Sequence, residues 1–354
     1  MRKKLIIFSV VALAASQALA SASSSISVTS LPQGMVVIAS AAVGSTTYLS
    51  LPLSGNVIYA GTVSAAGSNS INVATSRFTS ILASANAPCF VKMLSGGERG
   101  RMMQITSNSA NSLIVSTADN TTQQVTLLTS GFSVSAGDNF EIVPGDTIAA
   151  IFGANTRANP LTLAGSSNFN SADWVKVYNP SAGIWQAYYF NTSYGYWTLQ
   201  GTTTNANNTV LYPYSGLSIT RNANSEPAAS LILTGRVAEV PVMTKTTGNN
   251  AVVYGSTGYP LGLTLSQLNF GANWLKGTST TSADVLSVWN NSSKSFLSYY
   301  QMPDSTWRQA GNTTTDQSGT VVPAGDCISL QQHLSVSGST SYLPSSMPYT
   351  VPTL

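Results

Sequence analysis

The chain has 354 residues, and Asp, Glu, Lys and Arg together make up only 8% of them, far below the roughly 25% usual in soluble domains. Its formal net charge is +3, but Arg2, Lys3 and Lys4 are three of its fifteen basic residues, so from Ser21 onward twelve basic residues balance twelve acidic ones. A neutral chain argues against nucleic-acid binding, which needs a basic stripe. It favours association over mutual repulsion.

The N-terminus has the pattern of a cleavable secretory signal. The basic residues 2–4 precede the apolar run LIIFSVVALAA, and Ala18-Leu19-Ala20 supplies the small residues that signal peptidase reads. The run is too short for a membrane anchor, and no Cys follows it to carry a lipid. We therefore expect residues 1–20 to be removed, and the mature protein to be secreted or held at the cell surface without a transmembrane segment.

Only two cysteines are present, Cys89 and Cys327. In an oxidising compartment they are candidates for a disulfide, and the loop it closes would contribute roughly 5 kcal/mol in the loop-entropy model. Two free, buried thiols are the alternative. Sequence supplies no geometry to decide between them.

The expected elements are mainly short strands. Residues 21–33 are expected to form an extended lead-in. Strand–turn–strand patterns follow at 55–76 and 102–117, and further short strands at 126–145. Short helices are expected only at 146–153 and 264–270. The chain is therefore expected to be all-β, with turns spaced as in sandwiches or small barrels.

One phrase occurs twice: SADWVKVYNP at 171–180 returns as SADVLSVWNN at 282–291, at an offset of 111 residues. The order of matched residues holds over about sixty positions, which indicates an internal duplication. We expect residues 146–245 and 246–354 to be two β-sandwich-like repeat units. A separate barrel- or sandwich-like β domain is expected at 34–145. The matched pairs include Asp173 with Asp284, Tyr178 with Trp289, Tyr188-Tyr189 with Tyr299-Tyr300, and Trp197 with Trp307.

Several segments resemble a family of secreted proteins of unknown function that has expanded into many paralogues in verrucomicrobial bacteria. The resemblance rests on GMVVIASAAVGSTTYLSLPLSG (34–55), GGERGRMMQITSNSANSLIV (96–115), SAGDNFEIVPGDTIAAIFG (135–153) and the aromatic-to-TTT stretch at 188–204. It implies export and a role as a surface or matrix protein. It implies no reaction and no site residues.

The stretch YYFNTSYGYW (188–197) is the best candidate for ligand recognition. Aromatic positions shared with the second copy are expected in the core. Phe190, Tyr194 and Tyr196 have no aromatic counterpart there, and they are candidates for stacking on sugar rings. A hairpin whose aromatics serve only packing is the alternative.

Other motifs predict structure more than chemistry. Asp173 and Asp284 are candidates for binding a ligand or a metal, but a turn that bonds nearby amides is more ordinary. His333 is the single histidine, no nucleophile elbow surrounds a serine, and no zinc or calcium pattern occurs. GGERGRM at 96–102 is expected to be a solvated turn with weak ion pairs. We expect no catalytic residue, metal or cofactor.

These observations lead to two functional hypotheses. The first is a non-catalytic, exported structural or adhesive β protein whose partner is itself, as an oligomer, filament or matrix. An edge strand, including one supplied by the lead-in, would join the copies. The alternative is a carbohydrate-binding module for a surface polysaccharide.

Overall fold

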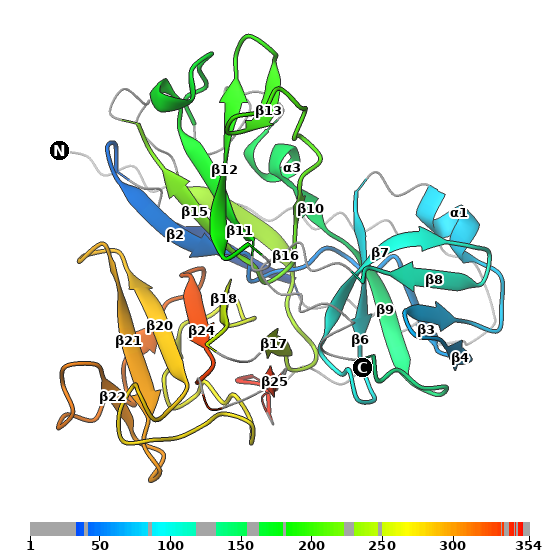
Figure 1. The fold of residues 1–354 in the computed structure, drawn as a ribbon. Coiled ribbons are helices and arrows are strands. Elements are labelled where there is room, and N and C mark those ends of the chain that lie inside the picture. Colours follow the sequence, from blue (N-terminus) through cyan, green and yellow to red (C-terminus); the bar gives the residue numbers. More distant parts are fainter. Residues whose placement is uncertain are drawn as a thin grey trace, which may run out of the picture. The chain divides into compact units, whose positions relative to one another are not determined.

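The computed structural model confirms an all-β chain (Figure 1). The expected signal and nearly all of the lead-in lie outside the described part. Within the described part, no helix has the length and apolar composition to cross a membrane. The structure describes residues 33–38, 42–83, 87–117, 132–153, 163–179, 182–222, 230–246, 250–333, 335, 340–342, 344 and 346–349.

The first repeat is built on a five-stranded antiparallel sheet in the order β13-β12-β11-β15-β2. A two-stranded ribbon, β1–β16, and the short pair β10–β14 pack on the same core. Apolar residues of the ribbon and sheet alternate towards this core, as expected for strands covered on one face. The strands are β1 (Gln33–Ile38), β2 (Thr46–Ser50), β10 (Asp146–Thr147), β11 (Trp174–Asn179), β12 (Ile184–Asn191), β13 (Tyr196–Leu199), β14 (Val210–Leu211), β15 (Gly216–Thr220) and β16 (Leu231–Arg236).

The second repeat has the same topology. Its five-stranded sheet runs β22-β21-β20-β24-β18, its ribbon is β17–β25, and its short pair is β19–β23. Each strand has its counterpart in the first repeat, in the same place in the sheet. The strands are β17 (Thr244–Thr246), β18 (Val252–Gly255), β19 (Leu263–Thr264), β20 (Val285–Asn290), β21 (Ser295–Gln301), β22 (Trp307–Gln309), β23 (Val321–Val322), β24 (Ile328–Gln331) and β25 (Thr340–Tyr342).

Between β2 and β10 lies a third body, a seven-stranded sheet in the order β3-β9-β6-β7-β8-β5-β4. Its two edge strands, β3 and β4, follow each other in the chain and are separated by only Val63 and Ser64. The Val63 N–H donates to the carbonyl of Asp138, next to β9, and the Ser64 N–H donates to the carbonyl of Asn72 in β5. The sheet therefore closes on itself as a small barrel. Its elements are β3 (Tyr59–Thr62), β4 (Ala65–Ala66), β5 (Ser70–Asn72), α1 (Phe78–Ala83), β6 (Cys89–Met93), β7 (Met102–Asn108), β8 (Ser112–Val115) and β9 (Asn139–Pro144).

The sheets divide the chain differently from the expected boundaries. β1 and β2 pair with β16 and β15, so they belong to the first repeat and not to a separate domain at 34–145. The barrel is an insertion into that repeat, at the place where the second repeat has only the short link between β18 and β19. We call residues 33–54 with 146–236 unit 1, residues 57–144 the insert, and residues 239–342 unit 2.

The aromatic positions shared by the two units lie in the core, as expected. Trp197 and Trp307 are fully buried, and Tyr188 and Tyr299 are buried beside them. The helix expected near residue 146 is α3 (Ile148–Phe152), capped by the Thr147 hydroxyl. The helix expected at 264–270 is wrong, because that segment makes a hydrogen-bonded turn next to the short strand β19. A 3-10 turn, η2 (Phe169–Ser171), precedes β11.

The two units contact each other through equivalent residues. Leu49 of β2 bridges to Asp326, and their equivalents Gly255 and Ser215 form the reciprocal bridge. Such an exchange of contacts is the property of an isologous interface around a twofold axis. Two reciprocal backbone hydrogen bonds accompany the bridges: Ser50 N to Gly325 O (2.8 Å) and Ser256 N to Tyr214 O (2.9 Å).

Aromatic rings fill this interface, three from each unit. Tyr48 lies 4.6 and 5.0 Å, between ring centroids, from two rings of unit 2. Its equivalent Tyr254 lies 4.7 and 4.8 Å from the corresponding two rings of unit 1. Such pairs contribute about 0.5–1.5 kcal/mol each beyond simple burial. The opposing rings are Trp289 and Phe296 in unit 2, and Tyr178 and Trp185 in unit 1.

Candidate functional site

Asp173 and Asp284 occupy equivalent buried positions just before β11 and β20. Asp173 accepts hydrogen bonds from the N–H groups of Ala164 and Asn222, at 2.8 and 2.7 Å. Asp284 accepts from Leu275 and His333, both at 2.8 Å. In both units the first amide lies nine residues before the Asp and the second 49 residues after it. Each carboxylate therefore ties the segment before its strand to the end of β15 or β24.

The local turn expected at these two residues is wrong, because neither amide partner belongs to an adjacent turn. The third partner differs between the units. Asp173 forms a buried ion pair with Arg221, with Nε and Oδ2 2.9 Å apart, whereas Asp284 accepts from the Tyr342 hydroxyl at 3.0 Å. Burial and the neighbouring carboxylate raise the pKa of Tyr342 far above its usual range. The candidate ligand site at these residues is thus occupied by the chain's own groups.

The segment GGERGRM does not form the solvated turn that was expected. Glu98 and Arg101 are buried, and only Arg99 between them is exposed. Glu98 lies 3.1 Å from Arg101 and 3.0 Å from Lys245 of β17. Burial lowers the pKa of Lys245. This ion-pair cluster joins the insert to unit 2, a contact over 147 residues that charge spacing along the sequence does not indicate.

A second buried cluster joins the insert to unit 1. Glu141 of β9 lies 3.3 Å from Lys92 of β6 and 3.0 Å from Arg236 of β16. Arg236 also pairs with Glu239. No group of three or more His, Cys, Asp and Glu residues able to hold a metal occurs among the described residues. These buried charges pair acids with bases and connect chain segments.

The two cysteines are free and buried in different bodies, the insert and unit 2. The disulfide considered from the sequence is therefore not formed in the structure. Burial raises the pKa of Cys89 and of Cys327 above the usual thiol range. Both remain protonated at neutral pH, and a thiol is a weak nucleophile.

The aromatic candidates in YYFNTSYGYW separate into two groups. Phe190 is only 6% exposed and packs in the core of unit 1, so its assignment to a recognition surface is wrong. Tyr194 is 45% exposed, and its ring stacks on that of Tyr196 with centroids 5.5 Å apart and an angle of 18°. The Tyr196 hydroxyl donates to the Thr203 carbonyl at 2.9 Å. The turn between β12 and β13 thus presents two parallel rings beside the solvent.

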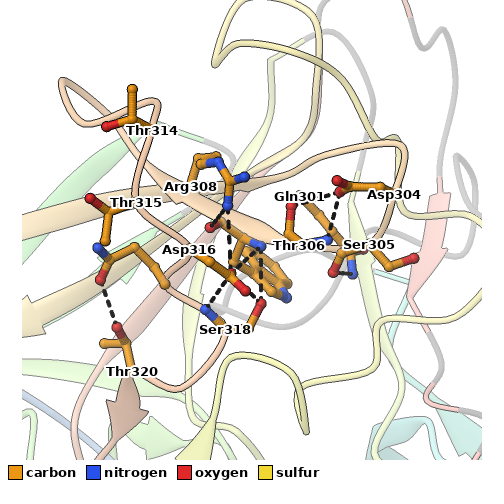
Figure 2. Close-up of polar contacts among 12 residues, drawn as sticks. Gln301, Asp304, Ser305, Thr306, Arg308, Thr314, Thr315, Asp316, Ser318 and Thr320 are labelled. Carbon is orange, nitrogen blue, oxygen red and sulfur yellow. Dashed lines mark hydrogen bonds and ion pairs between the residues drawn. The ribbon is translucent and has the colours of Figure 1, made fainter.

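The corresponding hairpin in unit 2 is polar (Figure 2). Asp304 accepts from the hydroxyl and N–H of Thr306, and Asp316 accepts from the same groups of Ser318. These bonds lower the pKa of both carboxyls. Arg308 lies 3.6 Å from Asp316. A carboxyl held ionised in this way has the opposite bias from a general acid, whose pKa must be raised.

His333 has its ring beside backbone and hydroxyl groups. Its Nε2 lies 2.7 Å from the Thr281 carbonyl oxygen, and its Nδ1 lies 2.7 Å from the Ser335 hydroxyl. The Asp284 carboxylate bonds to the backbone N–H of His333 instead of the ring. Among the described residues no carboxylate contacts the ring, as the Asp does to orient the base in a Ser-His-Asp triad.

A cleft of about 390 Å³ is lined by β1, by β20 and β21, and by residues 320–326. Its walls include Val37, Leu297, Val321 and Asp326. Burial raises the pKa of Asp326 to about 6. No sequence signal indicated this cleft, because its two walls come from segments about 250 residues apart along the chain.

Asp326→Asn is expected to stabilise the protein at pH 7.5 by about 1 kcal/mol, allowing for the partial exposure of the carboxyl. Since folding raises the pKa of Asp326 from its ordinary 3.8 to about 6, its favourable contribution is complete below pH 4 and is lost as pH rises through 6. Urea unfolding at pH 4 and 7.5 measures the effect, which should vanish at the lower pH. Asp304→Asn is the control: hydrogen bonds from Thr306 lower the pKa of Asp304, so its replacement should destabilise the protein at pH 7.5 instead of stabilising it. An equal gain at both pH values would contradict the argument.

The candidate features of the molecule are two equivalent units, an insert held by buried ion pairs, an exposed pair of tyrosines and an open cleft beside β1. No protein-family model matches the chain, and no curated protein or solved structure matches it either.

Proposed function

We propose that the mature chain is an exported, non-catalytic β protein with a structural or adhesive role, and that it acts by associating with itself outside the cell or at its surface. The main observation behind the proposal is that four of the chain's twelve acidic side chains are buried and hold distant segments of the chain together. Glu98, Glu141, Asp173 and Asp284 are all buried, and each joins segments distant in sequence. This use of carboxylates supports a rigid scaffold.

Two further observations support association. The chain from Ser21 onward has no net charge, so copies do not repel each other. Several large apolar side chains are exposed on β strands, among them Met35, Val37 and Ile232. The resemblance to secreted verrucomicrobial proteins adds the expectation of export.

Light scattering on residues 21–354 over a range of concentrations tests the proposal. We expect the weight-average mass to rise with concentration towards dimers or larger regular assemblies. Added salt should not disperse them, because contacts between uncharged groups are not screened. A monomer mass at every concentration would contradict self-association.

Saccharide binding is the second candidate function, favoured by the exposed stack of Tyr194 on Tyr196. Two parallel rings beside the solvent suit the apolar face of a sugar. Affinity electrophoresis on a panel of neutral polysaccharides should show retardation, lost when Tyr194 and Tyr196 are both changed to Ala. Ile184→Ala, on an exposed residue of the same sheet, is the control. Equal mobility of all variants on every polysaccharide would reject this function.

A further inference from the structure

The outer face of the β1–β16 ribbon is apolar and open. Met35, Val37 and Ile232 are 63%, 54% and 56% exposed, and Val37 lies directly opposite Ile232 in the ribbon. Val36 and Ile38 point the other way, into the core of unit 1. Among the described residues β1 pairs on one side only. Its other edge has neither Pro nor charge, which are the usual protections of an edge strand.

The duplication identifies what corresponds to β1 in unit 2. β16 and β25 are equivalent strands in the 111-residue repeat, so their partners β1 and β17 are equivalent as well. Leu231 and Tyr342 are 111 residues apart, and they pair with Ile38 and Thr244. Ile38 lies 11 residues before Leu49 of β2, and Thr244 lies 11 residues before its equivalent Gly255 of β18. In this correspondence Ile38 is equivalent to Thr244. The exposed Met35 is then equivalent to Pro241, and the exposed Val37 to Met243, and both of these residues of unit 2 are buried.

The insert covers that face in unit 2. The Met243 N–H donates to the Gly100 carbonyl at 3.1 Å. Gly100 has φ of +85°, and a Cβ on it would lie 2.0 Å from the Pro241 carbonyl oxygen, so only glycine permits this approach. Glu98 adds its ion pair to Lys245 beside the same contact. The exposed face of β1 is therefore equivalent to a face of unit 2 that is buried in the interface with the insert.

The neighbouring loop shows the same difference. Tyr212 of unit 1 is buried against the insert, with its ring 4.6 Å from that of Phe90 and its hydroxyl 2.7 Å from Gln104 Oε1. Its equivalent in unit 2, Pro323, is exposed. Val321 beside it is exposed as well, and both line the cleft next to β1. One of two equivalent faces is thus covered and the other is bare.

We propose that the bare face, formed by β1, Ile232 and the cleft rim at Val321 and Pro323, binds a second copy of this chain, an inference that rests on the proposed self-association. The free edges of two β1 strands pair antiparallel about a twofold axis, and the outer side chains of each copy enter the cleft region of the other. An isologous contact of this kind closes after two copies.

The chemistry of the face favours this occupant. Among the described residues that line the cleft, Asp326 is the one charged side chain. These residues include no basic group for an anionic ligand and no second carboxylate for a cation. An uncharged edge strand is complementary to itself, because its free N–H and C=O groups match those of an antiparallel copy.

Light scattering and cysteine cross-linking on residues 21–354 test the assignment. Val37→Lys places like charges across the contact and should raise the apparent dissociation constant at least tenfold. Ile184→Lys, equally exposed but on another strand, should leave it unchanged. The double variant Met35→Cys with Val37→Cys, in which a cysteine can face a cysteine of the other copy, should give a cross-linked dimer under mild oxidation, and Ile184→Cys should give none, since both native thiols are buried.

The outcomes separate the inference from the proposed function. Wild-type association that persists in Val37→Lys, with no cross-link through β1, overturns this interface and leaves self-association standing. A wild type that stays monomeric at all concentrations overturns both. Dimers that form only after residues 21–32 are deleted would show that the lead-in of the same chain occupies the face, and would overturn the second copy as its occupant.

Discussion

Asp173→Ala is expected to lower the free energy of unfolding by about 3–5 kcal/mol, the usual effect of removing one partner of a buried ion pair. The change removes the carboxylate that lies 2.9 Å from Arg221 Nε, and both side chains of this ion pair are fully buried. It also removes the acceptor of the Ala164 and Asn222 amides. Urea unfolding of residues 21–354, followed by tryptophan fluorescence, measures the loss.

Asp284→Ala is the matched comparison within the same chain. Asp284 accepts two amides at the same sequence offsets, but its third partner is the neutral Tyr342 hydroxyl. The loss should therefore be smaller than in Asp173→Ala, because no buried cation is left behind. Equal losses in the two variants would show that the ion pair contributes nothing beyond the amide bonds.

Glu98→Ala is expected to cost a similar 3–5 kcal/mol and to loosen the insert from unit 2. Glu98 is the shared carboxylate of Arg101 and Lys245, and all three side chains are buried. Without it two cations face each other in a protected site. The deficit should shrink as pH rises, since burial already lowers the pKa of Lys245 and its deprotonation relieves the repulsion. Unfolding curves at pH 7 and 10 measure both effects.

Arg99→Ala is the control for Glu98→Ala. Arg99 lies in the same turn but is exposed, so its removal should change stability by less than about 0.5 kcal/mol. Amide hydrogen exchange at Met243, which donates to Gly100, reports on the docked insert. Protection that is unchanged in Glu98→Ala would mean that the cluster does not hold the insert in place.

The duplication could be recognised from the sequence because the repeated residues are those that pack. Trp197 with Trp307 and Tyr188 with Tyr299 fill equivalent core positions, and a core position tolerates few substitutions. Asp173 and Asp284 were matched for the same reason, although their partners were not. One amide partner of each lies 49 residues downstream, and nothing in local spacing marks a hydrogen bond over that distance.

The division of the first repeat was not predicted. β1 and β2 are separated from the rest of unit 1 by the insert, and β17 and β18 share few residue types with them. Strand pairing depends on backbone groups that every residue carries, so a strand can keep its place in a sheet after its sequence similarity is lost. Phe190 was misplaced for a related reason: a β strand has two faces, and the absence of an aromatic counterpart does not say which face a residue occupies.

The sequence by itself determined the class of the fold, the duplication and the shared core, because these follow from short-range alternation and from repeated apolar residues. Only the tertiary structure decided that Glu98 and Glu141 are buried, that Tyr48 and Tyr254 meet the opposite unit, and that one of two equivalent faces is bare. Each of these depends on segments brought together from far along the chain. Burial changes what a charge or an apolar side chain contributes, and burial is a property of the folded molecule.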